Sequence, residues 1–141
     1  MLSRSGKQKQ IEKILDERAT SEKVLAVLVS NEEGLPIASR VENKASEYLL
    51  SAMAATLLTT ASATGLRLGM GAPETIRIEL NSGVLLIREI RVRACLLIVL
   101  ARDANLPFFD VQLTKMIREI DRVLFPDLPP QESGEQAEEE E

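Results

Sequence analysis

The sequence of 141 residues contains no histidine and no tryptophan, and it has a single cysteine, Cys95. Because histidine is the commonest general base and metal ligand, its absence excludes Ser-His and Cys-His catalytic pairs. One cysteine cannot form an intrachain disulfide, which fits a reducing compartment, and we expect a cytoplasmic protein. Cys95 lies in an apolar run, so an inert core thiol is the better interpretation than a nucleophile.

A phosphate-binding loop is also missing. The glycine-containing segment at residues 65–71, GLRLGMG, follows a predicted helix, whereas a phosphate loop leads into a helix N-terminus. The adjacent acids Glu32 and Glu33 lie in a predicted exposed turn, where water solvates them. The sequence therefore predicts a protein that is not an enzyme, with no catalytic residues, no cofactor and no metal.

Charge is distributed unevenly along the chain. The net charge is −5, but from Asp127 onward there are seven acidic residues and no basic one. The other 15 acidic residues face 17 basic ones, so the rest of the chain is close to +2. Arg88, Arg91 and Arg93 are near one another, but they are best interpreted as a solvated strand end. This balance lacks the clustered basic residues of a nucleic-acid-binding surface.

Long apolar runs are scarce, and the one stretch that raises the question of a membrane span is the uncharged segment at residues 48–66. Six of its nineteen residues are serine or threonine, and alanine dominates the rest, which is a weak pattern for a membrane-spanning helix. A helix buried between protein surfaces explains this composition better. The first ten residues are basic but lead into no apolar segment, so we expect no signal peptide.

Periodicity and turn signals predict an α+β fold with the order α-β-β-α-β-β-β-α. The predicted helices cover residues 6–19, 44–68 and 107–124, and the predicted strands cover 24–29, 35–41, 75–80, 84–90 and 94–101. Pro36 lacks an amide donor, so the second strand should lie at a sheet edge. We expect a flexible N-terminus at 1–5, one domain at 6–125 and a disordered acidic tail at 126–141.

The middle helix carries the clearest functional signal. At 100° per residue, the face predicted to cover a sheet consists of Leu50, Met53, Leu57, Ala61, Thr64 and Leu68. The opposite face consists of Tyr48, Ala52, Ala55, Thr59, Ser62 and Leu66. Small uncharged side chains permit close helix–helix approach, so the second face is predicted to be an association surface. The alternative is that a terminal helix of the same chain covers it.

Four segments together resemble the roadblock / dynein light chain (roadblock/LC7-type) family. They are the hairpin VLVSNEEGLPIASR at 27–40, the uncharged helix after it, the hairpin IRIELNSGVLLIREI at 76–90, and the junction LLIVLARDANLPFFDVQL at 96–113. The resemblance covers about residues 11–124, and in kind it is closest to prokaryotic small-GTPase regulators. The chain departs at Arg91-Val92-Arg93, where many relatives have a glycine- or aspartate-containing turn, and at Pro107, where glycine is commoner.

The resemblance implies a five-stranded antiparallel sheet in a profilin-like sandwich, with the middle helix on one face and the terminal helices on the other. It also implies a homodimer, or a heterodimer with a paralogous roadblock protein. In such dimers the middle helices lie side by side and the third strands pair. Members bind, activate or scaffold small GTPases, or link motor and membrane complexes, and they are not enzymes.

These implications give the expected sites and functions. The expected dimer interface is Tyr48, Ala52, Ala55, Thr59, Ser62, Ile76 and Ile78. Leu66 and Arg67 are expected to contact a small Ras-like GTPase, with Arg67 either an arginine finger or part of a surface that positions the GTPase's own residues. The alternatives are an adaptor subunit of a motor or membrane-associated complex without direct GTPase contact, and an enzyme or small-ligand sensor. We expect no nucleic-acid partner and no membrane span.

Overall fold

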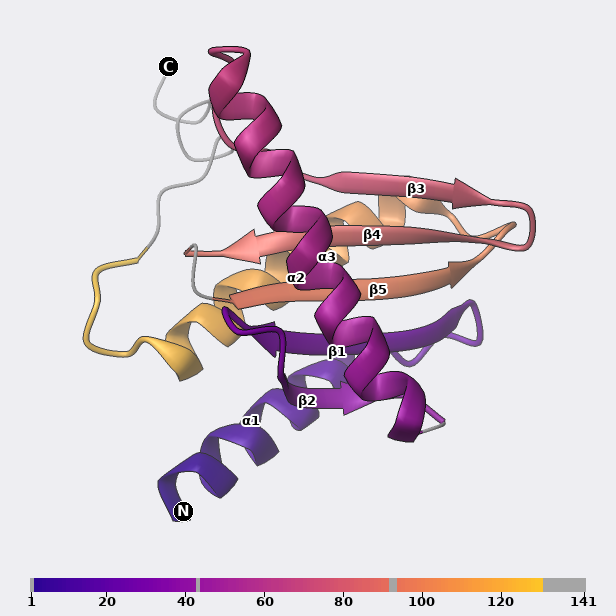
Figure 1. Ribbon diagram of the computed structural model, residues 1–141. Coiled ribbons are helices and arrows are strands. Elements are labelled where there is room, and N and C mark those ends of the chain that lie inside the picture. The colour runs from indigo at the N-terminus through magenta and orange to yellow at the C-terminus, as the bar shows by residue number, and fades with distance from the viewer. Residues whose placement is uncertain (1, 43, 92–93, 131–141) are drawn as a thin grey trace, which may run out of the picture.

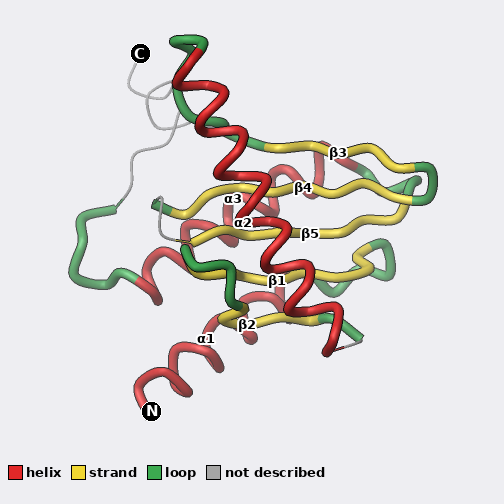
Figure 2. The backbone as a smooth tube through the Cα atoms, in the orientation of Figure 1, coloured by secondary structure: helices red, strands yellow, loops and turns green. Residues whose placement is uncertain are grey.

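The computed structural model describes residues 2–42, 44–91 and 94–130, and it has the predicted order of elements (Figures 1 and 2). The helices are α1 (Leu2–Arg18), α2 (Lys44–Arg67) and α3 (Leu106–Leu124). The strands are β1 (Val24–Asn31), β2 (Pro36–Arg40), β3 (Ile76–Leu80), β4 (Gly83–Ile90) and β5 (Ala94–Ala101).

The five strands form one antiparallel sheet in the order β2-β1-β5-β4-β3. The sandwich expected from the resemblance is confirmed, because α2 covers one face and α1 and α3 cover the other (Figure 1). Pro36 opens β2 at one edge of the sheet, as its missing donor requires, and β3 forms the other edge.

The main core lies between the sheet and the two terminal helices. Alternate residues of β1, β4 and β5 point to this side and pack against the apolar stripes of α1 and α3, which include Leu15, Leu113 and Met116. All three of these side chains are fully buried. The side chain of Asn105 caps α3 by accepting a hydrogen bond from the Phe108 amide at 3.1 Å, and Pro107 fits the first turn.

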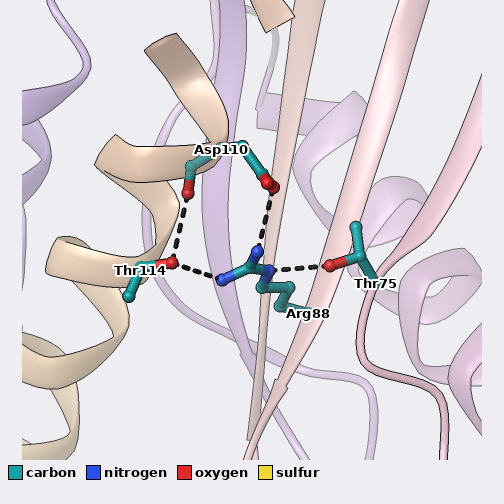
Figure 3. A network of polar contacts seen from close by, with 4 residues as sticks. All are labelled: Thr75, Arg88, Asp110 and Thr114. Carbon is teal, nitrogen blue, oxygen red and sulfur yellow. Dashed lines mark hydrogen bonds and ion pairs between the residues drawn. The ribbon is translucent and has the colours of Figure 1, made fainter. Parts of the chain in front are cut away.

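Polar contacts on the same side join α3 to the sheet. The guanidinium of Arg88 donates to Thr75 before β3, and to Thr114 and Asp110 on α3, at 2.7 to 2.9 Å (Figure 3). Arg91 donates to the buried carboxylate of Asp121 at 2.5 and 3.1 Å. Arg91 adopts a positive φ of 55°, a conformation that favours glycine, at the point where the sequence departs from many relatives.

The observed start of α1 differs from the predicted one, whereas the observed end of α3 agrees with it. α1 begins at Leu2 and not at Gly6, because a single glycine inside a helix weakens it by only about 1 kcal/mol. α3 ends at Leu124 as predicted, followed by a turn at residues 126–128. The acidic residues 131–141, the expected helix cap Asn43 and Arg93 lie outside the described residues, so the predictions for them stay predictions.

Candidate interaction surface

The outer face of α2 carries no charge between Glu47 and Arg67 and is open to solvent. Its largest apolar side chains are strongly exposed: Tyr48 is 62% exposed, Leu49 61% and Met53 47%. Other exposed side chains of this face are small or carry a hydroxyl group, namely Ala52, Thr56, Thr59, Thr60 and Ala63. A surface helix normally presents Lys, Glu and Arg to water, so this face has the composition of an interface.

The predicted rotation of α2 about its axis is correct only in part, because three of the six predicted sheet-facing residues are exposed. The side chains that face the sheet are Leu50, Ser51, Ala54, Leu57, Leu58 and Ala61, whereas Met53, Thr64 and Leu68 are exposed. α2 has apolar and small residues all round, so the sequence gives little contrast between an inner and an outer face. The pattern Leu50, Ala54, Leu57, Leu58, which concentrates the bulky aliphatic residues on one side, was the signal that could have fixed the rotation.

The expected interface residues therefore divide into two groups. Tyr48, Ala52 and Thr59 are exposed on α2 and available to a partner, whereas Ala55 and Ser62 are half-buried beside the sheet. A Cβ added at Gly34, which has φ +85°, would lie 3.5 Å from Ala55 Cβ. The turn between β1 and β2 thus packs closely against this flank of α2.

The C-terminal end of α2 extends beyond the edge strand β3 (Figure 1). Three large apolar side chains are exposed there, with Leu66 at 79%, Leu68 at 66% and Met70 at 80%. The loop folds back tightly, because the Met70 amide donates to Gly65 O and a Cβ on Gly65 would clash with Gly71 O. Arg67 is exposed in the last helical turn. The expected GTPase-contact residues, Leu66 and Arg67, are thus presented on an ordered protrusion.

The free edge of the sheet adds to this apolar surface. β3 pairs only with β4, so its outer backbone groups have no strand partner within the described chain. Ile76 and Ile78 are half-buried and alternate with Arg77 and Glu79, which form an ion pair at 2.6 Å. Ile76 packs into the small core beneath α2, and Leu80 at the end of the strand is 50% exposed.

A cavity of about 260 Å³ lies on the α2 side, where β1 and β4 end and β5 begins. Its wall includes Ala55, Thr59 and Ser62 of α2, and Glu89 and Cys95 of the sheet. Burial raises the pKa of the Glu89 carboxyl above its usual range, and it raises the pKa of the Cys95 thiol to about 11. The sequence did not predict this cavity, because it forms from segments far apart in the chain.

Residues 2–42, 44–91 and 94–130 show no arrangement of side chains that supports catalysis. They contain no group of three metal-ligating side chains, and the raised pKa of Cys95 keeps its thiol protonated at neutral pH.

By length and composition alone, Ser46–Arg67 would pass as a membrane-spanning helix. Seven serine and threonine residues and an inner stripe packed on the sheet favour a protein surface as its partner.

Residues 10–100 match the family model described as the Roadblock/LC7 domain. A Roadblock/LC7 domain from Streptomyces avermitilis has a TM-score of 0.76 and 16% identity, covering 80% of this chain and 96% of that one. Myxococcus xanthus MglB has a TM-score of 0.78 and 13% identity, covering 88% and 94%. The gliding protein MglB from Thermus thermophilus has a TM-score of 0.73 and 16% identity, covering 83% and 90%. At these identities the likeness concerns the fold, and no curated protein matches the sequence.

Proposed function

Because the chain belongs to the Roadblock/LC7 family, we propose that it is a dimeric, non-catalytic regulator or scaffold that binds a small Ras-like GTPase. The observation that carries the proposal is the uncharged, exposed outer face of α2 together with the apolar protrusion at its end. Family resemblance supplies the kind of partner, since members bind, activate or scaffold such GTPases.

Self-association is the first part of the proposal. α2 crosses one face of the sheet and its C-terminal end passes beside the edge strand β3 (Figure 1), so we expect a second copy to contact both. Pairing two β3 strands would satisfy their open backbone groups, and burying Leu49 and Met53 would remove apolar area from water. One related structure is described as MglB with a tetrameric arrangement, which supports self-association as a property within this fold.

GTPase binding is the second part. A regulator must bind the GTP and GDP forms with different affinity, because a ligand without differential affinity shifts no equilibrium. The test measures the affinity of the purified chain for a small GTPase encoded beside it, loaded with GDP or with a non-hydrolysable GTP analogue. We expect at least a tenfold difference in Kd. Equal affinities would remove the regulatory function and leave a passive scaffold, and absence of binding would contradict the proposal.

If the chain accelerates GTP hydrolysis, a variant at Arg67 distinguishes two modes of stimulation. As an arginine finger, Arg67 would place positive charge on the transferring phosphate, an effect worth roughly 10³–10⁵-fold. We favour the other mode, in which the dimer holds the GTPase's own catalytic residues, because Arg67 also fits as a cation at a helix C-terminus. Arg67→Ala should then change hydrolysis only slightly. Arg122→Ala, at an exposed site on α3, is the matched control.

A further inference from the structure

The cavity beside α2 contains a carboxylate for which the described chain offers no cation. Glu89 is half-buried, and no hydrogen bond or ion pair joins it to any residue within 2–42, 44–91 and 94–130. Among the described residues, the cations nearest in the strand are committed elsewhere: Arg88 binds Asp110 on α3, and Arg91 binds Asp121. Burial raises the pKa of the Glu89 carboxyl because it disfavours the charged form. A cation from outside the chain, bound beside this carboxylate, would stabilise the charged form.

The other polar side chains of the cavity present both donors and acceptors, because the Asn31 Oδ1 already accepts from the Glu33 and Leu35 amides and leaves its NH2 group as a donor. The Thr59 hydroxyl already donates to the carbonyl of Ala55 at 2.9 Å, so its lone pairs are what remain for a ligand. An ionised carboxylate accepts only, and Glu32 adds a second one at the rim. The two carboxylates and the Thr59 lone pairs suit a positively charged ligand that carries N–H donors.

Part of the wall is apolar. Ala55, Leu58 and Cys95 line the same cavity as Glu89, and their apolar surface suits the methylene groups of a long side chain. We propose that this cavity receives an arginine side chain from a partner protein, with its guanidinium bound to Glu89. Arginine fits better than lysine, because its five donors are fixed in a plane and it is more weakly hydrated. The proposal rests on the proposed function only in naming the GTPase as the protein that supplies the arginine.

The first experiment needs no partner protein. N-acetyl-arginine methylamide is titrated into the full-length, ¹⁵N-labelled chain, and the amide shifts of Thr59, Ser62 and Cys95 are followed. We expect saturable shifts in the millimolar range, and weaker ones with the lysine analogue. Glu89→Gln, which removes the charge and keeps the shape, should weaken binding at least fivefold. Glu33→Gln makes the same change in net charge on the nearby turn and should have no effect.

Three results would overturn the inference: no shift at these amides, equal binding by Glu89→Gln, or equal binding of the lysine analogue. Ser62→Leu, at a half-buried position of the wall, narrows the cavity without changing its charge and should also abolish the shifts of the Thr59 and Cys95 amides. It therefore provides a second test if Glu89→Gln does not fold. Because the described structure gives Glu89 no partner to lose, we expect Glu89→Gln to melt at or slightly above the wild-type temperature.

The second experiment asks whether the GTPase supplies the arginine. In its tighter-binding nucleotide state, the GTPase should bind Glu89→Gln about tenfold more weakly than it binds wild type or Glu33→Gln. If wild type binds and Glu89→Gln binds equally well, the GTPase is not the source, and this inference fails while the proposed function stands. If wild type binds no GTPase, the proposed function fails, and the titration with the arginine derivative alone decides whether the cavity is a basic-side-chain site.

Discussion

The two faces of the sheet differ in what covers them. On the α1 and α3 side, the core includes buried residues of both helices and of four strands, and its largest side chains have no exposure to solvent. On the α2 side the buried cluster is small, with Leu28, Ala54, Leu58, Ile87, Cys95 and Leu97 as its members. Beside it, Leu49 and Met53 on α2 stay exposed, as does Leu80 on β3.

This difference indicates a division of roles. The side with a closed core provides most of the stability of the single chain, because burying apolar area is the main favourable term in folding. On the α2 side, comparable apolar groups remain exposed to water. They contribute favourable free energy only when a partner covers them. The following predictions test whether stability and association separate in this way.

The largest expected effect comes from a matched pair of methionines. Met116 on α3 is fully buried and Met53 on α2 is 47% exposed. Met116→Ala should lower the free energy of unfolding by about 3 kcal/mol, because it loses burial and leaves a cavity. Met53→Ala should lower it by less than about 1 kcal/mol in dilute protein. Urea unfolding followed by circular dichroism measures both, and equal losses would mean that the two faces do not differ.

A smaller effect is expected where a charge is buried on the closed side. The Asp121 side chain is 7% exposed and is paired with Arg91. Arg91→Met removes the partner and leaves the carboxylate unsatisfied, which should cost about 2 kcal/mol in thermal or urea unfolding. Arg77→Met, in the exposed pair with Glu79, should cost less than about 1 kcal/mol. A loss with Arg77→Met as large as that with Arg91→Met would contradict this ranking.

The closed side was also the easier side to predict from the sequence. Leu113, Met116 and Ile120 recur at helical spacing among charged residues, so the buried stripe of α3 could be identified directly. The alternation in β3 and the glycine-containing turns similarly predicted the strands and their order along the chain. Those signals depend on a contrast between apolar and charged positions, which α3 and β3 possess.

The α2 side could be predicted only in part. The absence of charge from α2 indicated an interface, but without charged positions the rotation of the helix was set by packing against the sheet and not by a visible pattern. Glu89 was missed for a different reason. It lies in a regular strand, and only the folded chain brings it beside Thr59 and Cys95.

The smallest effect is expected for a surface ion pair. Lys23 Nζ lies 2.7 Å from Asp103 Oδ2, which lowers the pKa of the Asp103 carboxyl and raises the pKa of the Lys23 ammonium. The aspartate contribution is present above its unfolded pKa of about 3.9 and is lost as pH falls through the lower folded value. Asp103→Asn should therefore destabilise slightly at pH 6 and not below pH 3. A difference that persists in acid, or that is insensitive to 1 M salt, would exclude the ion pair as its cause.

Association requires a variant that changes the outer face of α2 alone. Ala55 is unsuitable, since it is half-buried and packs near Gly34, so a large substitution there would disturb the fold as well. Thr56 is exposed, and its hydroxyl bonds only to the carbonyl of Ala52 in the preceding turn. Thr56→Arg thus places a long charged side chain on the outer face without touching the sheet. Thr20→Arg, at an exposed position between α1 and β1, adds the same charge elsewhere.

Light scattering of the purified protein at tens of micromolar tests the central claim most directly. Wild type and Thr20→Arg should have about twice the 15.6 kDa mass of the chain or a higher multiple, whereas Thr56→Arg should be monomeric with an unchanged circular dichroism spectrum. A wild-type protein that is monomeric at this concentration, or a Thr56→Arg variant that assembles as wild type does, would contradict the assignment of the α2 face to self-association.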